Sequence, residues 1–296
     1  MRAQKRTFFY TMDEMWLNFV RTQISENGDN EESFYISSNP NTTWEMVLAN
    51  PTIPWNFDGL SQNENVTSEI VVANPEKPWN WGCMSCNPNV TWDFVFANMD
   101  KPWLFNVLQN FVPVTRELVE SHPEIDWNYR CLSYNPGVTW EWVQSCPDRS
   151  WCFSSLSKHP AITWDIIQEN PLAFVPCFFS LNPNVTWSLV EAHPEYPWNY
   201  YSLTCHPNIT FDIIKANPDK SWDVHFLSKN VNITWEIIQA NPDVAWNYFH
   251  LSENPNITLD IVMSNPHLPW SDTMLCMNRM TKHPLLRQRQ MCYVLK

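Results

Sequence analysis

One threonine recurs every 24 residues along the chain, and this period constrains the fold more than any other feature. The clearest copy of the repeat runs from Thr234 to Ile257 and reads TWEIIQANPDVAWNYFHLSENPNI. Repeats of this length are supersecondary units that bury their apolar faces against their neighbours. The period therefore predicts one elongated, stacked array without a single central core. With one single-residue deletion near Leu172, the repeats begin at Thr43, Thr67, Thr91, Thr115, Thr139, Thr163, Thr186, Thr210, Thr234 and Thr258.

The composition is that of a folded protein. Apolar residues make up 44% and aromatic residues 15% of the 296 residues, too many for a disordered chain. Only 4 residues are glycine, so we expect proline and asparagine to make the turns. The first residues, MRAQKRTFFY, lack the apolar run of a signal peptide, and no stretch of about 18 apolar residues exists. We therefore expect a protein that is neither secreted nor membrane-spanning.

Each repeat predicts two very short helices. An acid follows the threonine two residues later in nine of ten copies, as in Thr234 with Glu236, which marks a capped N-terminus. Both helices stop at an Asn-Pro pair or a variant of it, because the residue before proline avoids helical dihedrals. Each helix then has about seven residues, too few to be stable alone. The second helix begins after a capping residue that follows a tryptophan or its equivalent: Asn56, Asn80, Asn128, Asn199, Asp223, Asn247 or Ser271.

The predicted fold is therefore all-α: an α-solenoid of about ten 24-residue helical hairpins. Leucine-rich repeats share the period, but neither their strand signature nor any alternation of period two is present. Fifteen of the eighteen tryptophans stand at two positions of the repeat. This fixed register favours a role in the core and between repeats, with a stack for sugars or bases as the alternative.

The two ends differ from the array. Residues 1–30 are predicted to hold a capping helix, over about 12–24 with Thr11 and Glu14 as a capping box, and a polar loop. The array itself covers 31–278, and residues 279–296 are predicted to form a basic cap with a helix over about 284–294. In the early repeats Leu48, Val72 and Phe96 form an apolar strip, which would be exposed to solvent unless another segment packs on it. We expect the N-terminal helix, through Met15, Trp16 and Phe19, to cover it.

No pattern in the chain indicates catalysis, a cofactor or a metal. The pair Cys83 and Cys86 has no second pair at zinc-ribbon distance, so free thiols are the favoured interpretation of the nine cysteines. No nucleophile elbow, phosphate loop or HExxH sequence is present. Four histidines replace asparagine before a proline at helix ends, where we expect a cationic ring to suit the helix dipole: His122, His159, His193 and His206.

The repeat itself resembles a known group of sequences. Tandem units of the form NPNITW[DE]II followed by NPDxPWN[WY] look like the uncharacterised repeat proteins of giant nucleocytoplasmic DNA viruses, such as marseilleviruses and mimiviruses. The likeness covers about residues 31–278. It implies a viral protein acting in the host cytoplasm, in a viral factory, or in the virion, and it implies no catalytic residue.

Charge gives one functional hypothesis. Residues 31–278 carry 27 acidic and 9 basic side chains, a net charge of −18, whereas residues 279–296 carry five basic and no acidic ones. Such a body repels nucleic acid. It favours a basic protein partner, or head-to-tail self-association, although capping and solubility also explain much of the acidity. One acid per repeat lies in the turn between the helices, and these rim acids are the candidate docking residues: Glu76, Asp100, Glu124, Asp148, Glu195, Asp219 and Asp243.

A second candidate surface lies where the repeats disagree. The second and sixth positions of the second helix vary freely, and positions four apart share one helix face. This stripe is predicted to bind protein, unless it is a solvated face without function; its members include Arg130, Tyr134, Ser154, Lys158, Tyr201, Cys205, His225, Lys229, Phe249 and Glu253. The sequence thus predicts a non-enzymatic protein-binding scaffold. The alternative is a structural component of a virus particle.

Overall fold

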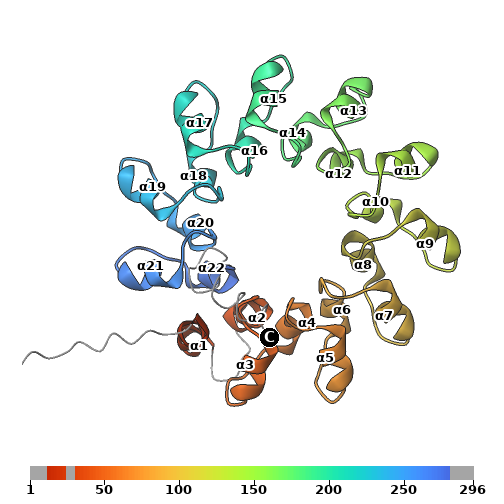
Figure 1. Cartoon of the computed structure of the whole chain (residues 1–296), viewed down its shortest axis with the longest axis vertical. Coiled ribbons are helices and arrows are strands. Elements are labelled where there is room, and N and C mark those ends of the chain that lie inside the picture. Colours follow the sequence, from red (N-terminus) through yellow and green to blue (C-terminus); the bar gives the residue numbers. More distant parts are fainter. Residues whose placement is uncertain (1–11, 25–30, 281–296) are drawn as a thin grey trace, which may run out of the picture.

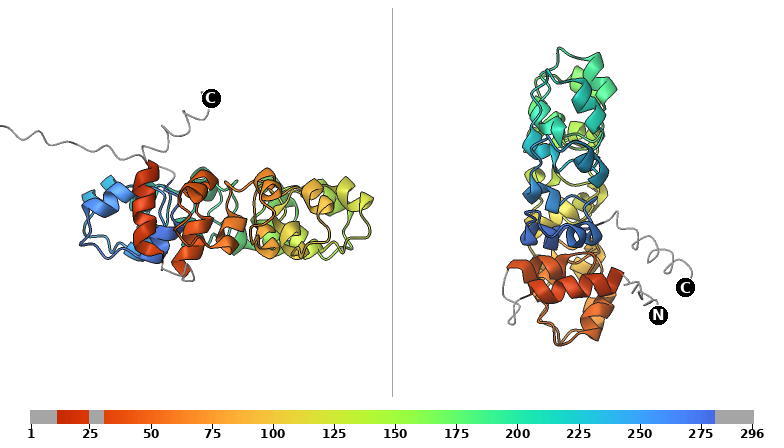
Figure 2. Two further views of the ribbon diagram at one scale, coloured as in Figure 1. Left: turned by 90° about the horizontal axis from the view of Figure 1, so that it is seen from below. Right: turned by 90° about the vertical axis from the view of Figure 1, so that its left-hand side faces the viewer.

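The helices of the chain form a closed ring (Figure 1). The computed structural model describes residues 12–24 and 31–280, and within these ranges all regular structure is helical, in 22 helices. The predicted all-α repeat fold is therefore confirmed. The predicted elongated shape is wrong, because each hairpin turns relative to the previous one until the last repeat meets the first. Views from the side show that the ring is flat (Figure 2).

The ring has two concentric layers of helices. Each outer helix has six residues, and the inner helices have four to eight. The inner layer comprises α2 (Glu31–Ser38), α4 (Phe57–Gln62), α6 (Trp81–Met84), α8 (Phe105–Phe111), α10 (Tyr129–Leu132), α12 (Phe153–Ser157), α14 (Pro176–Phe179), α16 (Tyr200–Thr204), α18 (Val224–Leu227), α20 (Tyr248–Ser252) and α22 (Asp272–Met277). The outer layer comprises α3 (Trp44–Ala49), α5 (Ser68–Ala73), α7 (Trp92–Ala97), α9 (Arg116–Ser121), α11 (Trp140–Ser145), α13 (Trp164–Glu169), α15 (Trp187–Ala192), α17 (Phe211–Ala216), α19 (Trp235–Ala240) and α21 (Leu259–Ser264). The first helix, α1 (Met12–Gln23), stands outside this alternation.

The threonine caps form largely as predicted. In eight outer helices the threonine hydroxyl accepts a hydrogen bond from the amide three residues on, whereas Thr163 and Thr258 make no such bond. The following acid takes part in the cap. Hydrogen bonds to the Thr67 hydroxyl and to its own amide hold the pKa of Glu69 below its usual value. All seven predicted caps of the inner helices accept an amide hydrogen bond as well.

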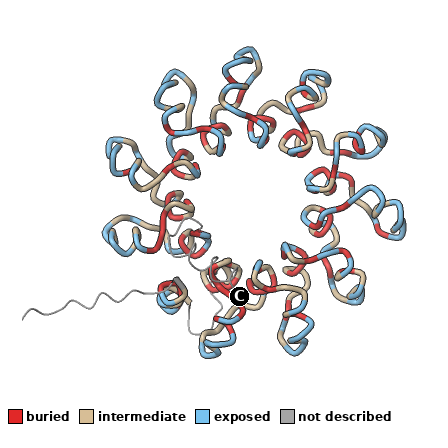
Figure 3. The backbone as a smooth tube through the Cα atoms, in the orientation of Figure 1, coloured by how far each residue is buried: buried red, intermediate tan, exposed pale blue. Residues whose placement is uncertain are grey.

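The tryptophan before each inner helix closes the turn between the two helices. In nine repeats its indole Nε1 donates to the backbone carbonyl five residues earlier, as Trp198 does to His193 at 2.8 Å. In the shortened repeat Phe174 takes this place, and it is buried without the bond. The rings pack between the layers, where buried side chains form a band around the ring (Figure 3). Their predicted role in the core is confirmed.

Neighbouring repeats are joined by a buried residue after each inner helix. The Nδ2 of Asn63 lies within hydrogen-bond distance of the carbonyl oxygens of Ser37, Asn39 and Thr42, at 2.8, 2.9 and 3.0 Å. Its Oδ1 accepts from the amide of Asn65 at 2.7 Å. A row of such residues follows the ring, and we call it the asparagine ladder: Asn39, Asn63, Asn87, Asn135, His159, Asn182, His206, Asn230, Asn254 and Asn278, each at most 5% exposed. One repeat has no ladder residue. Phe111 stands at the equivalent position there, and it is 61% exposed.

The two ladder histidines make hydrogen bonds equivalent to those of the ladder asparagines. In His159, Nδ1 accepts from the amide of Ala161 at 3.1 Å, and Nε2 lies 2.9 Å from the Asn135 carbonyl, to which it donates. A ring that accepts at Nδ1 is neutral, and burial lowers the pKa of both His159 and His206. The predicted cationic role is therefore wrong for these two. His122 and His193 end outer helices instead, with Nδ1 beside Glu124 and Glu195.

The ring closes with the same hydrogen bonds that join neighbouring repeats. Asn39 Nδ2 lies 2.8 Å from the Cys276 carbonyl and 3.0 Å from that of Asn278, 237 and 239 residues away. Asn41 Nδ2 reaches the Arg279 carbonyl at 3.1 Å, as Asn65 reaches Pro40 within the array. Helix α2 therefore contacts α22 on one side and α4 on the other. Helix α2 thereby completes the inner layer of the ring.

Helix α1 covers the closure. Trp16 is fully buried, its Nε1 donates to the Thr42 hydroxyl at 2.9 Å, and the cluster around it contains both Met46 and Leu259, which belong to the first and last outer helices. The predicted helix over 12–24 is thus confirmed, but its predicted cover is wrong. Leu48 and Val72 remain 56% and 66% exposed, because α1 packs between α3 and α21 rather than along the early repeats. Phe96 stacks on the His122 ring at 4.2 Å.

The predicted boundaries meet the structure in part. The polar loop was predicted within residues 1–30, and α2 begins at Glu31. The repeat array of 31–278 corresponds to α2 through α22. The predicted closing helix over 284–294 lies outside the described residues, and so does most of the basic segment 279–296.

Candidate interaction surfaces

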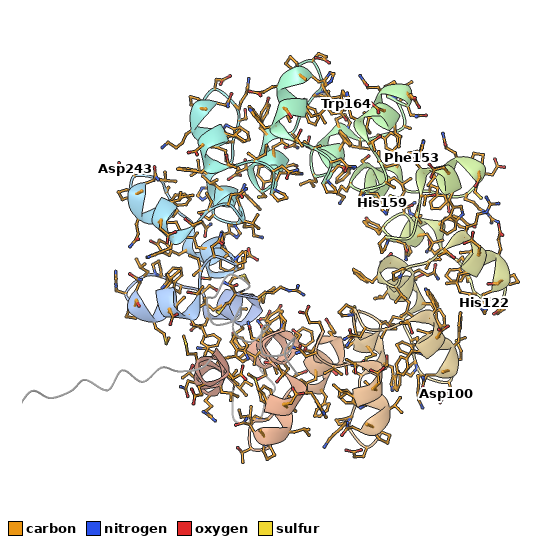
Figure 4. The ribbon with its side chains drawn as sticks, viewed as in Figure 1. Asp100, His122, Phe153, His159, Trp164 and Asp243 are labelled. Atoms are coloured by element: carbon orange, nitrogen blue, oxygen red, sulfur yellow. The ribbon has the colours of Figure 1, made fainter. Side chains whose placement is uncertain are left out.

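The rim acids lie at the outer edge of the ring, on the tips of the hairpins. All seven are exposed, and Asp100 and Asp243 show their placement at the periphery (Figure 4). Their regular recurrence around the edge follows from the repeat, as the sequence predicts. The tips are the most exposed part of each hairpin (Figure 3).

Most rim acids already have a cationic neighbour. Glu76, Asp100 and Asp219 form ion pairs with the lysine that follows each of them, at 3.5, 2.9 and 3.0 Å. Glu124 and Glu195 face the imidazoles of His122 and His193 at 2.8 and 3.2 Å. The hydrogen bond from Lys101 is the main reason why the pKa of Asp100 lies below its usual value. Exposed pairs of this kind add little to stability, but they do reduce the negative charge that the rim presents.

The variable positions of the inner helices face the middle of the ring. The fourth residue of each inner helix from α4 to α22, for example Leu132, is buried against the outer layer. The second and sixth residues lie about 200° away from it around the helix axis, on the opposite side. In α10 to α20 we call these positions the inner strip: Arg130, Tyr134, Ser154, Lys158, Cys177, Leu181, Tyr201, Cys205, His225, Lys229, Phe249 and Glu253. The side chains drawn in Figure 4 leave the centre of the ring open.

Side chains of the inner strip touch from one helix to the next. Lys158 Nζ lies 6.0 Å from the ring centre of Tyr134 in the previous inner helix and 4.8 Å from that of Phe178 in the next. Further along, the rings of Tyr201 and Phe226 are 4.8 Å apart. The strip is therefore a continuous cationic and aromatic surface across several repeats.

The strip ends in an ion pair. Lys229 Nζ is 2.8 Å from Glu253 Oε1, and His250 Nδ1 is 3.3 Å from the same oxygen. Phe226 links this group to the rest of the strip, since its ring lies 5.2 Å from that of His250. Phe178 and Phe226 stand at the third helical position, so the sequence pattern of second and sixth positions missed them. The sequence did contain a signal for these two rings, because each directly follows a strip residue, Cys177 or His225.

The opposite arc of the inner layer has different chemistry. The same positions in α4, α6 and α8 carry Asp58, Gln62, Gly82, Cys86, Asn106 and Asn110, without an aromatic ring or a cation. Asp58 accepts a hydrogen bond from Asn80 Nδ2 at 2.8 Å. The two arcs share one backbone plan, so they form a natural comparison between a cationic aromatic surface and a small polar one.

One cysteine was missed by the sequence reasoning. Cys152 stands at the cap of α12, where half of the repeats have asparagine, and its Sγ lies 3.1 Å from the hydroxyls of both Ser154 and Ser155. Partial burial raises its pKa, but these hydroxyls and the nearby Arg130 outweigh that effect and lower it to about 7. The replacement of a capping asparagine by cysteine before two serines was the signal in the sequence.

No metal or membrane element is found in the described part of the chain. Within it, no three side chains of the types His, Cys, Asp and Glu lie where they would hold a metal ion, and this includes the surroundings of Cys83 and Cys86. None of the described helices has the length and apolar character that crossing a bilayer requires. No protein-family model matches the chain, and comparison with curated proteins and with solved structures gives no match either.

Proposed function

We propose that the protein is a non-enzymatic ring scaffold that binds other proteins. The observation that carries the proposal is the difference between two classes of position. Caps, turn tryptophans and the asparagine ladder recur in nearly every repeat because they hold the ring. The inner strip changes from copy to copy, and yet it contains large exposed side chains such as Tyr134 and Tyr201, at 55% and 49% exposure. Repeat proteins generally bind partners through such an extended surface.

The rim is the second surface that the proposal includes, and a basic partner is its expected occupant. Asp148 and Asp243 are exposed and have no ion pair with a described residue. The other five rim acids bind a basic partner only in competition with their own lysine or histidine neighbours. Head-to-tail association of the basic segment 279–296 with the acidic flank stays a prediction, since most of that segment lies outside the described residues.

The test is capture of partners by the full chain from cells in which it is naturally made, followed by mass spectrometry. Two variants serve as matched baits: a strip variant, Arg130→Gln with Lys158→Gln, and a rim variant, Glu76→Gln with Asp100→Asn, Asp219→Asn and Asp243→Asn. We expect at least one protein to be captured stoichiometrically and to be lost from one of the two variants. If every captured protein binds both variants as it binds the natural chain, the scaffold function is refuted for these surfaces.

A structural component of a virus particle is the second candidate. The closed ring favours it, because the hairpin tips recur around a rim without a free end, as suits a building block in a larger assembly. The resemblance of the repeat to giant-virus proteins places such a role in the virion or the host cytoplasm. Copurification with particles at high copy number supports this role, whereas absence from purified particles counts against it.

A further inference from the structure

We propose that the inner strip binds an extended, acidic peptide segment of a partner protein, one that carries aromatic or aliphatic side chains between its acids. This inference rests on the proposed scaffold function and gives its inner surface a ligand class. It concerns α10 to α16 above all, where the strip is both positive and aromatic.

The charge of the strip points to an anionic ligand. Arg130 and Lys158 have no ion pair with a described residue, and no carboxylate occupies a strip position between α10 and α16. Around the rim, by contrast, Lys77, Lys101 and Lys220 each pair with an adjacent acid. Arg149 and Lys215 also lack an ion pair with a described residue, but they lie in a hairpin turn and in the outer helix α17. Arg130 and Lys158 are therefore the two unmatched cations of the inner strip, in a body with a net charge of −18. A ligand carboxylate is the group that complements them.

The aromatic side chains point to a peptide with apolar residues. Tyr134 and Tyr201 are about half exposed, and the Lys158 ammonium lies over the Phe178 ring at 4.8 Å. Tyrosine and arginine dominate the energetics of protein interfaces, since they combine large contact area with directed hydrogen bonds. A carboxylate flanked by aromatic or aliphatic groups matches a surface on which cations lie between rings.

The geometry fits an extended chain that follows the curve of the ring. Neighbouring inner helices lie roughly 10 Å apart, and an extended chain advances about 3.3 Å per residue. A peptide therefore passes one inner helix about every three residues, and about nine residues span α10 to α16. Acids about three residues apart would meet Arg130 and Lys158 in turn.

Single-stranded nucleic acid is disfavoured for the same strip. Nucleic acid requires a row of cations along its phosphates, and base stacking adds to that row. Here only Arg130 and Lys158 are unmatched, because Lys229 is bound to Glu253. The acidic body repels a polyanion at long range more strongly than it repels a peptide with a few acids.

The experiment selects ligands without assuming a sequence. A phage-displayed library of random dodecapeptides is selected on the immobilised full chain, and the peptide that is most enriched is synthesised with a fluorescein label for anisotropy measurements. We expect enrichment of Asp and Glu together with Phe, Tyr, Trp or Leu. Arg130→Gln with Lys158→Gln is expected to weaken binding of that peptide about tenfold at low salt. The matched control is Gln62→Ala with Asn106→Ala, at strip-equivalent positions of the opposite arc, and it should bind unchanged. Equal melting temperatures of all three proteins show that folding is intact.

Four results overturn the inference. Selected acidic peptides that bind the Arg130→Gln, Lys158→Gln variant as tightly as the natural chain place the site elsewhere. Enrichment of basic peptides, lost on neutralising the rim acids, leaves the scaffold function standing and removes the inner strip as its site. Tighter binding of oligouridylate than of the selected peptide, lost in the same strip variant, assigns the strip to nucleic acid. If no peptide binds at all, the inference falls, whereas the scaffold function is still decided by the capture of partner proteins.

Discussion

At the scale of single residues, a buried amide side chain joins one repeat to the next. Asn230 has 0% exposure and reaches the carbonyls of Thr204, His206 and Ile209, so it satisfies backbone acceptors that the short helices leave unpaired. The sequence showed this asparagine only as a residue at the end of a helix. Its partners lie 21 to 26 residues away, so no local pattern could reveal them.

The ladder histidines make the ring sensitive to acid. Burial lowers the pKa of His159 and His206, so the unfolded chain binds their protons more readily than the ring does. Their contribution to stability is therefore complete above the ordinary histidine pKa of about 6.5 and is lost as the pH falls below it. We expect His159→Asn with His206→Asn to reduce the drop in melting temperature between pH 7 and pH 5.5. The control variant, His225→Asn with His267→Asn, removes two exposed rings. An equal drop in all three proteins would show that the ladder rings do not couple to pH.

At the scale of helices, caps and turns define elements that cannot exist alone. A six-residue helix is unstable in isolation, so the threonine cap and the tryptophan turn matter only together with packing. These elements were predictable because a cap and its amide lie three residues apart, and a tryptophan and its carbonyl five. The cover made by α1 was not predictable, since Trp16 packs against Met46 and Leu259, which are far apart in the sequence.

Two substitutions of a turn tryptophan distinguish the contribution of its packing from that of its hydrogen bond. Trp198 is 7% exposed and donates to the His193 carbonyl. We expect Trp198→Ala to lower the free energy of unfolding by about 3–5 kcal/mol, the usual loss for a buried large aromatic. Trp198→Phe, which copies the natural Phe174, keeps most of the packing and should cost about 1–2 kcal/mol. Chemical denaturation measures both. A loss below about 1 kcal/mol for the alanine variant would mean that the turn does not depend on this ring.

Helix α1 covers the closure, and the alkylation rate of the Cys276 thiol measures how well it does so. Cys276 is fully buried beneath α1, and burial raises its pKa to about 12, so it should resist alkylation. Trp16→Ala removes the ring that fills this cluster together with its hydrogen bond to Thr42. We expect alkylation of Cys276 to become faster in this variant, as followed by peptide mass spectrometry, while exposed Cys86 reacts at the same rate in both proteins. Unchanged protection of Cys276 would show that the closure holds without α1.

At the scale of the whole molecule, the chain is one ring in which the last repeat packs against the first, as neighbouring repeats do elsewhere. The curvature was beyond sequence reasoning, because it is the sum of small rotations over eleven inner helices, and a slight change per step opens the ring. The candidate surfaces were predictable as helix faces, but not their separation. Closure places the rim acids outside and the inner strip inside, so the two surfaces face different sides of the ring.

Closure is tested most directly by Förster energy transfer across the seam. Ketone-bearing residues at positions 38 and 277, the last residues of α2 and α22, carry the dyes, and a control pair at 134 and 158 spans one junction inside the array. The ring predicts high transfer for both pairs, since adjacent inner helices lie roughly 10 Å apart. An open solenoid would separate the seam pair by the length of the array. Low transfer at the seam with high transfer in the control pair would contradict the ring.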